Sequence, residues 1–268
     1  MKDRQFVGLD TYSLCTSKLS IYRHDRPADP VELAIGTGFF YKYGSQRYLV
    51  TNWHNVTGID FQSGKSISST GARPTNFAVR FVTNDSRATL YLNLGLYDEK
   101  GDPAWLIDPN SSRKVDVLAI PLPTWPKDSI NTFIGDIEER DLQISVGVDV
   151  FIIGFPQGID RGLAPLWKKG SLAVDPDTAN NLSKPYWLID CASRKGMSGS
   201  PVVIRRFSPF EDESGNVFSR GHGTRFIGIY SGRFEDKDPL GAHLGIVWPR
   251  ELLQEIVVAG VFDRSLSR

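Results

Sequence analysis

The sequence predicts a mostly β protein whose strands form a β-sandwich or β-barrels. Many short apolar runs, rich in β-branched and aromatic residues, follow one another along the 268-residue chain. Gly, Pro, Asn, Asp and Ser separate these runs, which is typical of strands joined by turns. The clearest helical segment, "PRELLQEIVVAG" at 249–260, comes late, and we expect Pro249 to begin it and Gly260 to end it.

The expected strands form two groups with a boundary between them. The first group comprises "KLSIYR", "ELAIGTGFFYKY", "RYLVTNW", "FAVRFV", "TLYLNL" and "DVLAIPL". The second comprises "DVFIIGF", "YWLIDCA", "SPVVIRR" and "RFIGIYSG", with a polar insertion at 207–223 that we expect to be an exposed loop. The proline-containing polar segment at 121–142 separates the groups. We therefore expect an N-terminal lobe over 1–125 and a C-terminal lobe over 126–268.

The composition argues against several classes of function. The 31 basic and 31 acidic residues cancel, so the sequence favours neither a nucleic-acid partner nor an anionic membrane. Apolar runs stay well short of the roughly 18 residues that cross a bilayer, and "MKDRQFVGLDTYSLCTSKLS" lacks the core of a signal peptide. Cys15 and Cys191 are expected to be buried thiols in a cytoplasmic protein. The histidines and cysteines lack ligand-like spacing, so we expect no metal and no cofactor.

One serine stands in a loop that exposes it. The stretch "RKGMSGSPVV" places Ser198 between Gly196 and Gly199, where glycines permit a sharp turn. A serine hydroxyl becomes a nucleophile when an oriented base takes its proton. His54 directly follows the apolar run of "YLVTNWHNV", at a strand end that can hold a catalytic side chain. Asp116 begins another run, in "RKVDVLAIPLP", where a carboxylate needs a partner such as an imidazole N–H.

The same residues have competing interpretations. Asp108, in "LIDPNSS", is the chief rival to Asp116, although an aspartate before proline is ordinarily part of a turn. Trp53, next to His54, is expected to pack between the lobes. "GMSGS" could also be the G-x-S-x-G elbow of α/β-hydrolases, but Ser200 replaces the last glycine, a strand-like run follows, and the triad order differs.

The order His54, Asp116, Ser198 resembles the chymotrypsin-like (trypsin-like) serine proteases. "GTGFFYKYGSQRYLVTNWHNV" is similar to the first hairpin leading to the family's histidine, and "VDVLAIPL" to its aspartate strand. "VGVDVFIIGFPQGI" resembles bacterial high-temperature-requirement proteases. "DCASRKGMSGSP" resembles the serine loop, with an "SGSP" ending similar to bacterial glutamyl endopeptidases. These pieces span residues 34–250, and no appended peptide-binding domain is recognisable after them.

The resemblance implies a fold and a reaction. The fold would be all-β, with two six-stranded antiparallel β-barrels and a short C-terminal helix. Ser198 would attack a peptide carbonyl, His54 would carry the proton, and Asp116 would fix the imidazole tautomer. The backbone N–H groups of Gly196 and Ser198 would form the oxyanion hole.

Met197 departs from the digestive enzymes of this family. Those enzymes carry an aspartate at this place, which captures a new N-terminal ammonium after proteolytic activation. Methionine has no charge to offer. We therefore expect a protein that is synthesised competent, or that is controlled by a loop rearrangement or an activating protein partner.

The resemblance also places a substrate-binding set. Ala192 would lie at the floor of the primary specificity pocket, while Ser231, Gly232 and Arg233 would line the substrate strand. Ala192 has no charge, and Tyr230 stands where glutamyl endopeptidases carry a histidine, so neither basic nor glutamate preference is supported. An apolar or small side chain is expected. Basic residues of the rim could instead favour acidic substrates: Arg194, Lys195, Arg233 and His243.

Two classes of function follow from these residues. The first is a bacterial serine endopeptidase that acts on polypeptides, with narrow specificity or partner-controlled activation. The second is a catalytically silent protein of the same fold that binds peptides or regulates another protein, because a fold alone does not confer activity. Retention of His54, Asp116, Ser198 and Gly196 favours the enzyme.

Overall fold

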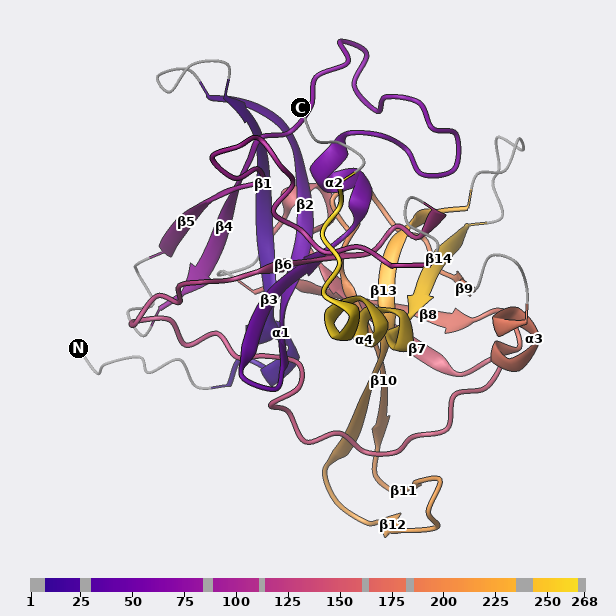
Figure 1. The fold of residues 1–268 in the computed structure, drawn as a ribbon. Coiled ribbons are helices and arrows are strands. Elements are labelled where there is room, and N and C mark those ends of the chain that lie inside the picture. Colours follow the sequence, from indigo (N-terminus) through magenta and orange to yellow (C-terminus); the bar gives the residue numbers. More distant parts are fainter. Residues whose placement is uncertain are drawn as a thin grey trace.

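The structure is a computed structural model with two β-units side by side (Figure 1). It describes these ranges: 8–24, 30–83, 89–110, 114–160, 164–181, 186–234 and 243–264. All strands of the first unit precede residue 122, and all strands of the second follow residue 148.

The first unit is a six-stranded antiparallel sheet with the order β5-β4-β1-β2-β3-β6. Its strands are β1 (Thr16–His24), β2 (Pro30–Tyr43), β3 (Gln46–Thr51), β4 (Asn76–Val82), β5 (Thr89–Gly95) and β6 (Leu118–Pro121). The expected closed barrel is not seen here, because β5 and β6 lie at opposite edges in the described pairing. β6 is only four residues long, and its outer edge meets Leu106 in an isolated bridge to Ala119 instead of a full strand.

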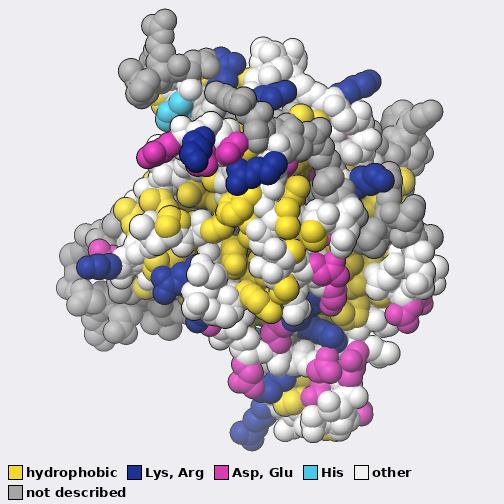
Figure 2. All heavy atoms as spheres, in the orientation of Figure 1, with side chains coloured by type: hydrophobic (Ala, Val, Ile, Leu, Met, Phe, Trp, Pro, Cys, Tyr) yellow, Lys and Arg dark blue, Asp and Glu magenta, His cyan; other side chains and the backbone are white. Residues whose placement is uncertain are grey.

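The second unit is the expected closed six-stranded barrel, with the order β10-β13-β14-β9-β8-β7. Its strands are β7 (Asp149–Gly154), β8 (Leu166–Leu172), β9 (Trp187–Asp190), β10 (Pro201–Phe207), β13 (His222–Arg233) and β14 (Leu244–Pro249). The 207–223 insertion protrudes from it as a hairpin of β11 (Phe210–Glu211) and β12 (Val217–Phe218), carrying charges of both signs (Figures 1 and 2). Its expected exposure is confirmed.

Helices are few and short. The expected C-terminal helix is α4 (Arg250–Ala259), with Pro249 as N-cap and Gly260, at φ 63°, as C-cap. α4 contacts β6 of the sheet as well as β13 and β14 of the barrel, so it bridges the two units. The others are α1 (Thr11–Cys15), α2 (Trp53–Thr57), the 3-10 turn η2 (Pro156–Gly158) and α3 (Pro176–Asn180). Within the described ranges, no helix has the length and apolar character needed to cross a membrane.

The two units share one apolar core. Phe39 of β2 packs edge-on against Phe226 of β13 with 5.5 Å between ring centroids, and Trp248 of β14 joins the same cluster. Cys15 and Cys191 are buried free thiols, as expected. The shared core fixes β2 and β3 against the barrel, which brings loops from both units to one place.

Replacing Phe226 by alanine tests this interface. Phe226 is 2% exposed, and losing a buried phenylalanine costs about 3–5 kcal/mol because a cavity remains. We expect Phe226→Ala to lower the free energy of unfolding in urea by that amount. Phe207→Ala is the matched control, since Phe207 is 67% exposed, and should change it by less than about 0.5 kcal/mol. Equal effects of the two substitutions would contradict a shared core.

Candidate active site

His54 lies where strand β3 ends and helix α2 begins. Asn52 is the N-cap of α2, and its side-chain amide donates to the backbone oxygen of Asp116 at 2.6 Å. At the other end, the N–H of Gly58, in the left-handed conformation, donates to the backbone oxygen of His54. This short helix therefore fixes His54 against the segment that precedes β6.

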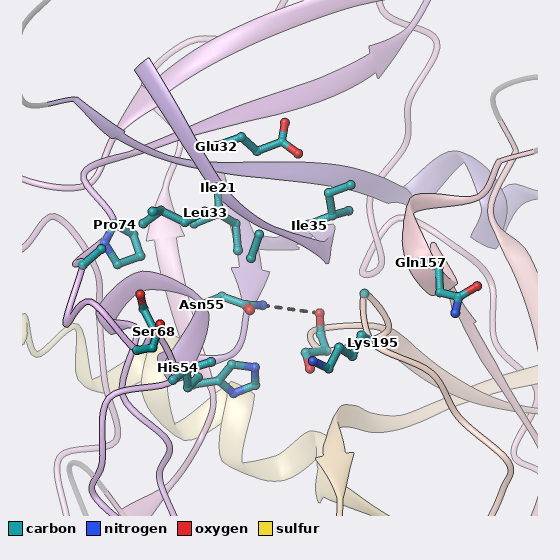
Figure 3. A pocket seen from close by; sticks show the side chains of 17 residues that line it. Ile21, Glu32, Leu33, Ile35, His54, Asn55, Ser68, Pro74, Gln157 and Lys195 are labelled. Atoms are coloured by element: carbon teal, nitrogen blue, oxygen red, sulfur yellow. Dashed lines mark hydrogen bonds between the residues drawn. The ribbon is translucent and has the colours of Figure 1, made fainter. Parts of the chain in front are cut away.

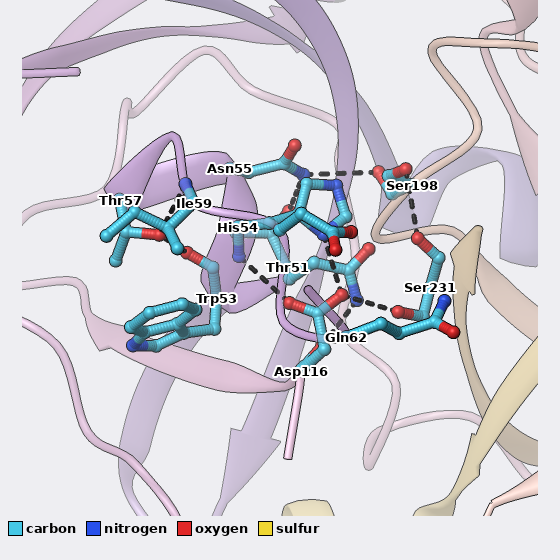
Figure 4. Close-up of polar contacts among 12 residues, drawn as sticks. Thr51, Trp53, His54, Asn55, Thr57, Ile59, Gln62, Asp116, Ser198 and Ser231 are labelled. Atoms are coloured by element: carbon cyan, nitrogen blue, oxygen red, sulfur yellow. Dashed lines mark hydrogen bonds and ion pairs between the residues drawn. The ribbon is translucent and has the colours of Figure 1, made fainter. Parts of the chain in front are cut away.

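Asp116 holds the imidazole in a buried site. The carboxylate is fully buried, and one oxygen accepts the backbone N–H of His54 at 2.9 Å. The other lies 2.6 Å from Nδ1 of His54 and also accepts the hydroxyl of Ser231 (Figure 4). Three donors thus satisfy a buried carboxylate that would otherwise be costly to desolvate. With Nδ1 occupied as a donor, Nε2 of the neutral ring is the free acceptor.

The surroundings of His54 shift its pKa in opposite directions. Burial alone lowers the pKa of His54, but the charge of Asp116, the hydrogen bond to it and the charge of Asp60 together outweigh burial. The net result is a pKa above the ordinary histidine value. The imidazole is therefore a stronger base than a free histidine.

Ser198 lies next to the imidazole but donates elsewhere. Figure 4 shows the His54 ring between Asp116 and Ser198. The Oγ of Ser198 donates to the backbone oxygen of Ser231 at 3.1 Å, and among the described residues it has no hydrogen bond to His54. A rotation of the Ser198 hydroxyl is needed before His54 can take its proton. Catalytic hydrogen bonds are often completed only when substrate is bound.

The serine loop turns sharply at Gly196. Gly196 has φ 93°, and a Cβ there would lie 2.4 Å from the backbone oxygen of Phe155. The backbone oxygen of Lys195 accepts the N–H of Gln157 at 2.6 Å, which turns the Gly196 N–H the opposite way. In the described part of the chain, the N–H groups of Gly196 and Ser198 have no hydrogen-bond acceptor. These are the two amides that the resemblance assigns to an oxyanion hole.

Met197 is fully buried within the apolar interior of the barrel. Apolar packing thus anchors the serine loop at the place where Met197 stands.

Thr37 of β2 ties the serine loop to the other unit, and sequence reasoning missed it. Its N–H donates to the backbone oxygen of Ser198 at 2.9 Å. Its hydroxyl donates to the backbone oxygen of Gly196 at 2.7 Å and accepts the N–H of Phe155 at 3.1 Å. The glycines that flank Thr37 in "GTGF" were the available signal, because glycines allow two backbone segments to approach closely. Here Gly199 lies so close to β2 that a Cβ on it would be 2.0 Å from the backbone oxygen of Thr37.

The two competing residues have other roles. Asp116, and not Asp108, pairs with Nδ1 of His54. Trp53 packs in the core of the first sheet, and its indole N–H donates to Asp263, beyond α4, at 3.2 Å. Trp53 therefore anchors α2 to the core of the first sheet and to Asp263.

Two of the expected substrate-binding residues, Ala192 and Arg233, lie next to Ser193. Ala192 is exposed, whereas Ser193 is buried and shares a hydrogen bond with the Tyr230 hydroxyl. The guanidinium of Arg233 donates to the Ser193 backbone oxygen at 2.8 Å, and that of Arg194 does so at 3.2 Å. The side chains of Arg233 and Arg194, both from the expected basic rim, thus donate to one carbonyl oxygen. The large side chain in contact with Ser193 is that of Tyr230.

A cavity of about 820 Å³ opens beside His54 and Ser198. His54, Gly196 and Ser198 line one end of it (Figure 3). The rest of its wall comes mainly from β2 and from residues 67–74. Within the described ranges, no group of three or more His, Cys, Asp or Glu side chains could hold a metal ion.

Comparison with known proteins gives low similarity. No family model matches the chain, and no curated protein matches its sequence. The crystal structure of the inactive form of Rv3671c protease aligns at 16% identity over 92% of this chain and 89% of that chain, with a TM-score of 0.46. The active form of Rv3671c protease from M. tuberculosis aligns at 15% identity over 94% and 83%, with a TM-score of 0.47. Likeness at this level assigns no residue role here.

Thr37→Val is the sharpest test of the serine-loop tether. Valine keeps the shape but removes the hydroxyl, leaving the Gly196 carbonyl and the Phe155 N–H without their partner. Because misplacement of an oxyanion donor costs about 10²–10³ in rate, we expect a fluorophosphonate to label Thr37→Val at least about tenfold more slowly than the wild type. Thr37→Ser keeps the hydroxyl and should label at nearly the wild-type rate. Equal labelling of valine and serine variants would show that the hydroxyl does not position the loop.

Proposed function

We propose that the protein is a serine endopeptidase of the chymotrypsin-like type. The observation that carries this proposal is the buried Asp116–His54 pair beside Ser198, facing two unoccupied backbone N–H groups. A neutral imidazole with Nδ1 bonded to a carboxylate has only Nε2 left to accept a proton. Ser198, whose hydroxyl is the proposed nucleophile, lies beside the imidazole ring (Figure 4).

The reaction would proceed through an acyl-enzyme. Ser198 Oγ attacks the carbonyl carbon while His54 takes the hydroxyl proton, and Asp116 stabilises the resulting imidazolium. The carbonyl oxygen gains negative charge next to the N–H groups of Gly196 and Ser198. His54 then gives the proton to the leaving amine, and water repeats the sequence on the ester.

The substrate segment before the scissile bond would pair with the edge of β13. Ser231, Gly232 and Arg233 lie there, beside the oxygen to which Ser198 now donates. Ala192 and Ser193 would lie beneath the side chain that precedes the bond. The proposal also includes narrow specificity or control by an activating protein partner.

One observation favours the second candidate, a catalytically silent peptide-binding or regulatory protein. The Ser198 hydroxyl is bonded to Ser231 and not to His54. A protein that kept this arrangement would bind a peptide in the cleft without acylation.

Labelling with a fluorophosphonate probe distinguishes the two. The probe reacts with a serine that its base has activated and needs no knowledge of the substrate. We expect the wild type to be labelled, and Ser198→Ala and His54→Ala to remain unlabelled. A well-folded wild type that resists labelling, alone and with candidate partners, would favour the silent protein.

The pH dependence of labelling tests the Asp116–His54 pair. Only neutral His54 can accept a proton, so labelling should rise with pH through the raised pKa of His54, with a midpoint above about 6.5. In Asp116→Asn the carboxylate charge is lost while burial remains, so the residual rate should be lower and the midpoint should move to lower pH. Asp108→Asn is the control and should leave the midpoint in place. A midpoint that does not move in Asp116→Asn would contradict the assignment.

A further inference from the structure

The cavity beside Ser198 is predominantly apolar. Its apolar lining (Figure 3) comes from Ile21 of β1, Leu33 and Ile35 of β2, and Ala72 and Pro74 of the segment between α2 and β4. Two charged side chains of opposite sign, Glu32 and Lys195, also belong to its lining. Opposite charges give no net preference for a charged ligand, so the apolar wall decides what the cavity accepts.

A β-bulge shapes this wall. Ile21 pairs with Ala34 and Tyr22 pairs with Glu32, so Leu33 is an extra residue in β2. A bulge redirects the side chain at the point where it occurs, and Figure 3 shows Leu33 close to Ile21. The strand therefore presents Leu33 and Ile35 to the cavity, in a stretch that also pairs with β1.

The opposite wall is fixed to the catalytic helix. The N–H of Ile67 donates to the backbone oxygen of Gly58 at 2.8 Å. A Cβ at Gly58 would lie 3.1 Å from the oxygen of Ala72 and 3.2 Å from Pro74. Gly58 is the C-cap of α2, which carries His54. The cavity is thus built onto the same short helix as the base.

The cavity lies on the side of the leaving group, an inference that rests on the proposed function. Residues before the scissile bond would pair with β13 at Ser231–Arg233, and none of those residues lines the cavity. The chain after the bond leaves Ser198 on the other side, toward His54, which protonates the departing amine. From the scissile bond, the first two residues on that side reach about 7 Å.

We propose that this cavity is a specificity site for a bulky apolar side chain, such as Leu, Ile or Phe, within the first two residues after the scissile bond. Burying such a side chain is favourable in proportion to the apolar area removed from water. A carboxylate placed there would lose its hydration against the apolar wall, and the repulsion of Glu32 would offset the attraction of Lys195. The protein would therefore select its substrates on both sides of the bond.

Acyl transfer measures this site apart from the rest of the reaction. A p-nitrophenyl ester acylates Ser198 with no residue on the leaving-group side, and release of p-nitrophenol reports that step. An added dipeptide amide then competes with water: its amine nitrogen bonds to the ester carbonyl carbon, the bond from that carbon to Ser198 Oγ breaks, and the amine proton returns to Oγ through His54. The ratio of peptide product to free acid reports binding in the cavity.

We expect Leu-Leu-amide to give a ratio about tenfold or more above that of Gly-Gly-amide, and Asp-Asp-amide to give the lowest. Leu33→Lys should reduce the advantage of Leu-Leu-amide and raise the ratio for Asp-Asp-amide, a gain that misfolding cannot produce. Val31→Lys is the control on the same strand, because Val31 is exposed and outside the cavity, and should keep the wild-type order.

The outcomes separate the two proposals. Normal release of p-nitrophenol with equal ratios for all three amides would overturn the specificity site and leave the endopeptidase in place. Ratios that change equally in Leu33→Lys and Val31→Lys would also overturn it. Failure to release p-nitrophenol, in a protein that also resists the fluorophosphonate, would overturn the proposed function and the specificity site with it.

Discussion

The hydrogen bonds between Thr37 and the serine loop are the constraint on which the site depends. The proposed catalytic groups come from different units, with His54 and Asp116 beside the first sheet and Ser198 on the barrel. Thr37 holds the carbonyls of both Gly196 and Ser198 from across the junction. Its neighbour Phe39 anchors β2 in the shared core two residues further on. Apolar packing brings the units together, and the directional hydrogen bonds of Thr37 fix the position of the serine loop.

Moving the Ser198 hydroxyl from its present hydrogen bond requires little free energy. One neutral hydrogen bond contributes about 0.5–1.5 kcal/mol net, so exchanging the Ser231 oxygen for the His54 nitrogen is easily reversible. The costly elements are already in place: the glycine conformations, the orientation of the Lys195–Gly196 peptide and the ionic partner of His54. Under the proposed function, a substrate would need to reorient only the Ser198 hydroxyl.

Much of this arrangement was predictable from the sequence, because local chemistry determines it. The strand pattern, the C-terminal helix with its Pro249 and Gly260 boundaries, and the position of His54 at a strand end all follow from short-range rules. The pairing of Asp116 with His54 was predictable, because a buried carboxylate without a hydrogen-bond donor would be costly. Each of these inferences needs only a few neighbouring residues.

Other features depend on contacts between distant residues, and the sequence did not predict them. The register shift at Leu33 depends on pairing with Ile21, and the role of Thr37 depends on the approach of Gly199. Closure of the first sheet was expected from resemblance, but the short β6 leaves its outer edge to an isolated bridge. The hydrogen bond between Tyr230 and Ser193, next to the expected pocket floor at Ala192, was likewise not predicted. Such outcomes require three-dimensional packing.

The contact between Trp53 and Asp263 has a consequence for biosynthesis. Helix α2 carries the base, yet its indole support comes from a residue more than two hundred positions later in the chain. Translation proceeds from the N-terminus, so the ribosome must release nearly the whole described chain before this support can form. Ser198 likewise emerges long after His54. Under the proposed function, a chain still being synthesised could not yet cleave other nascent polypeptides, because Ser198 and Asp263 both follow His54 by more than a hundred residues.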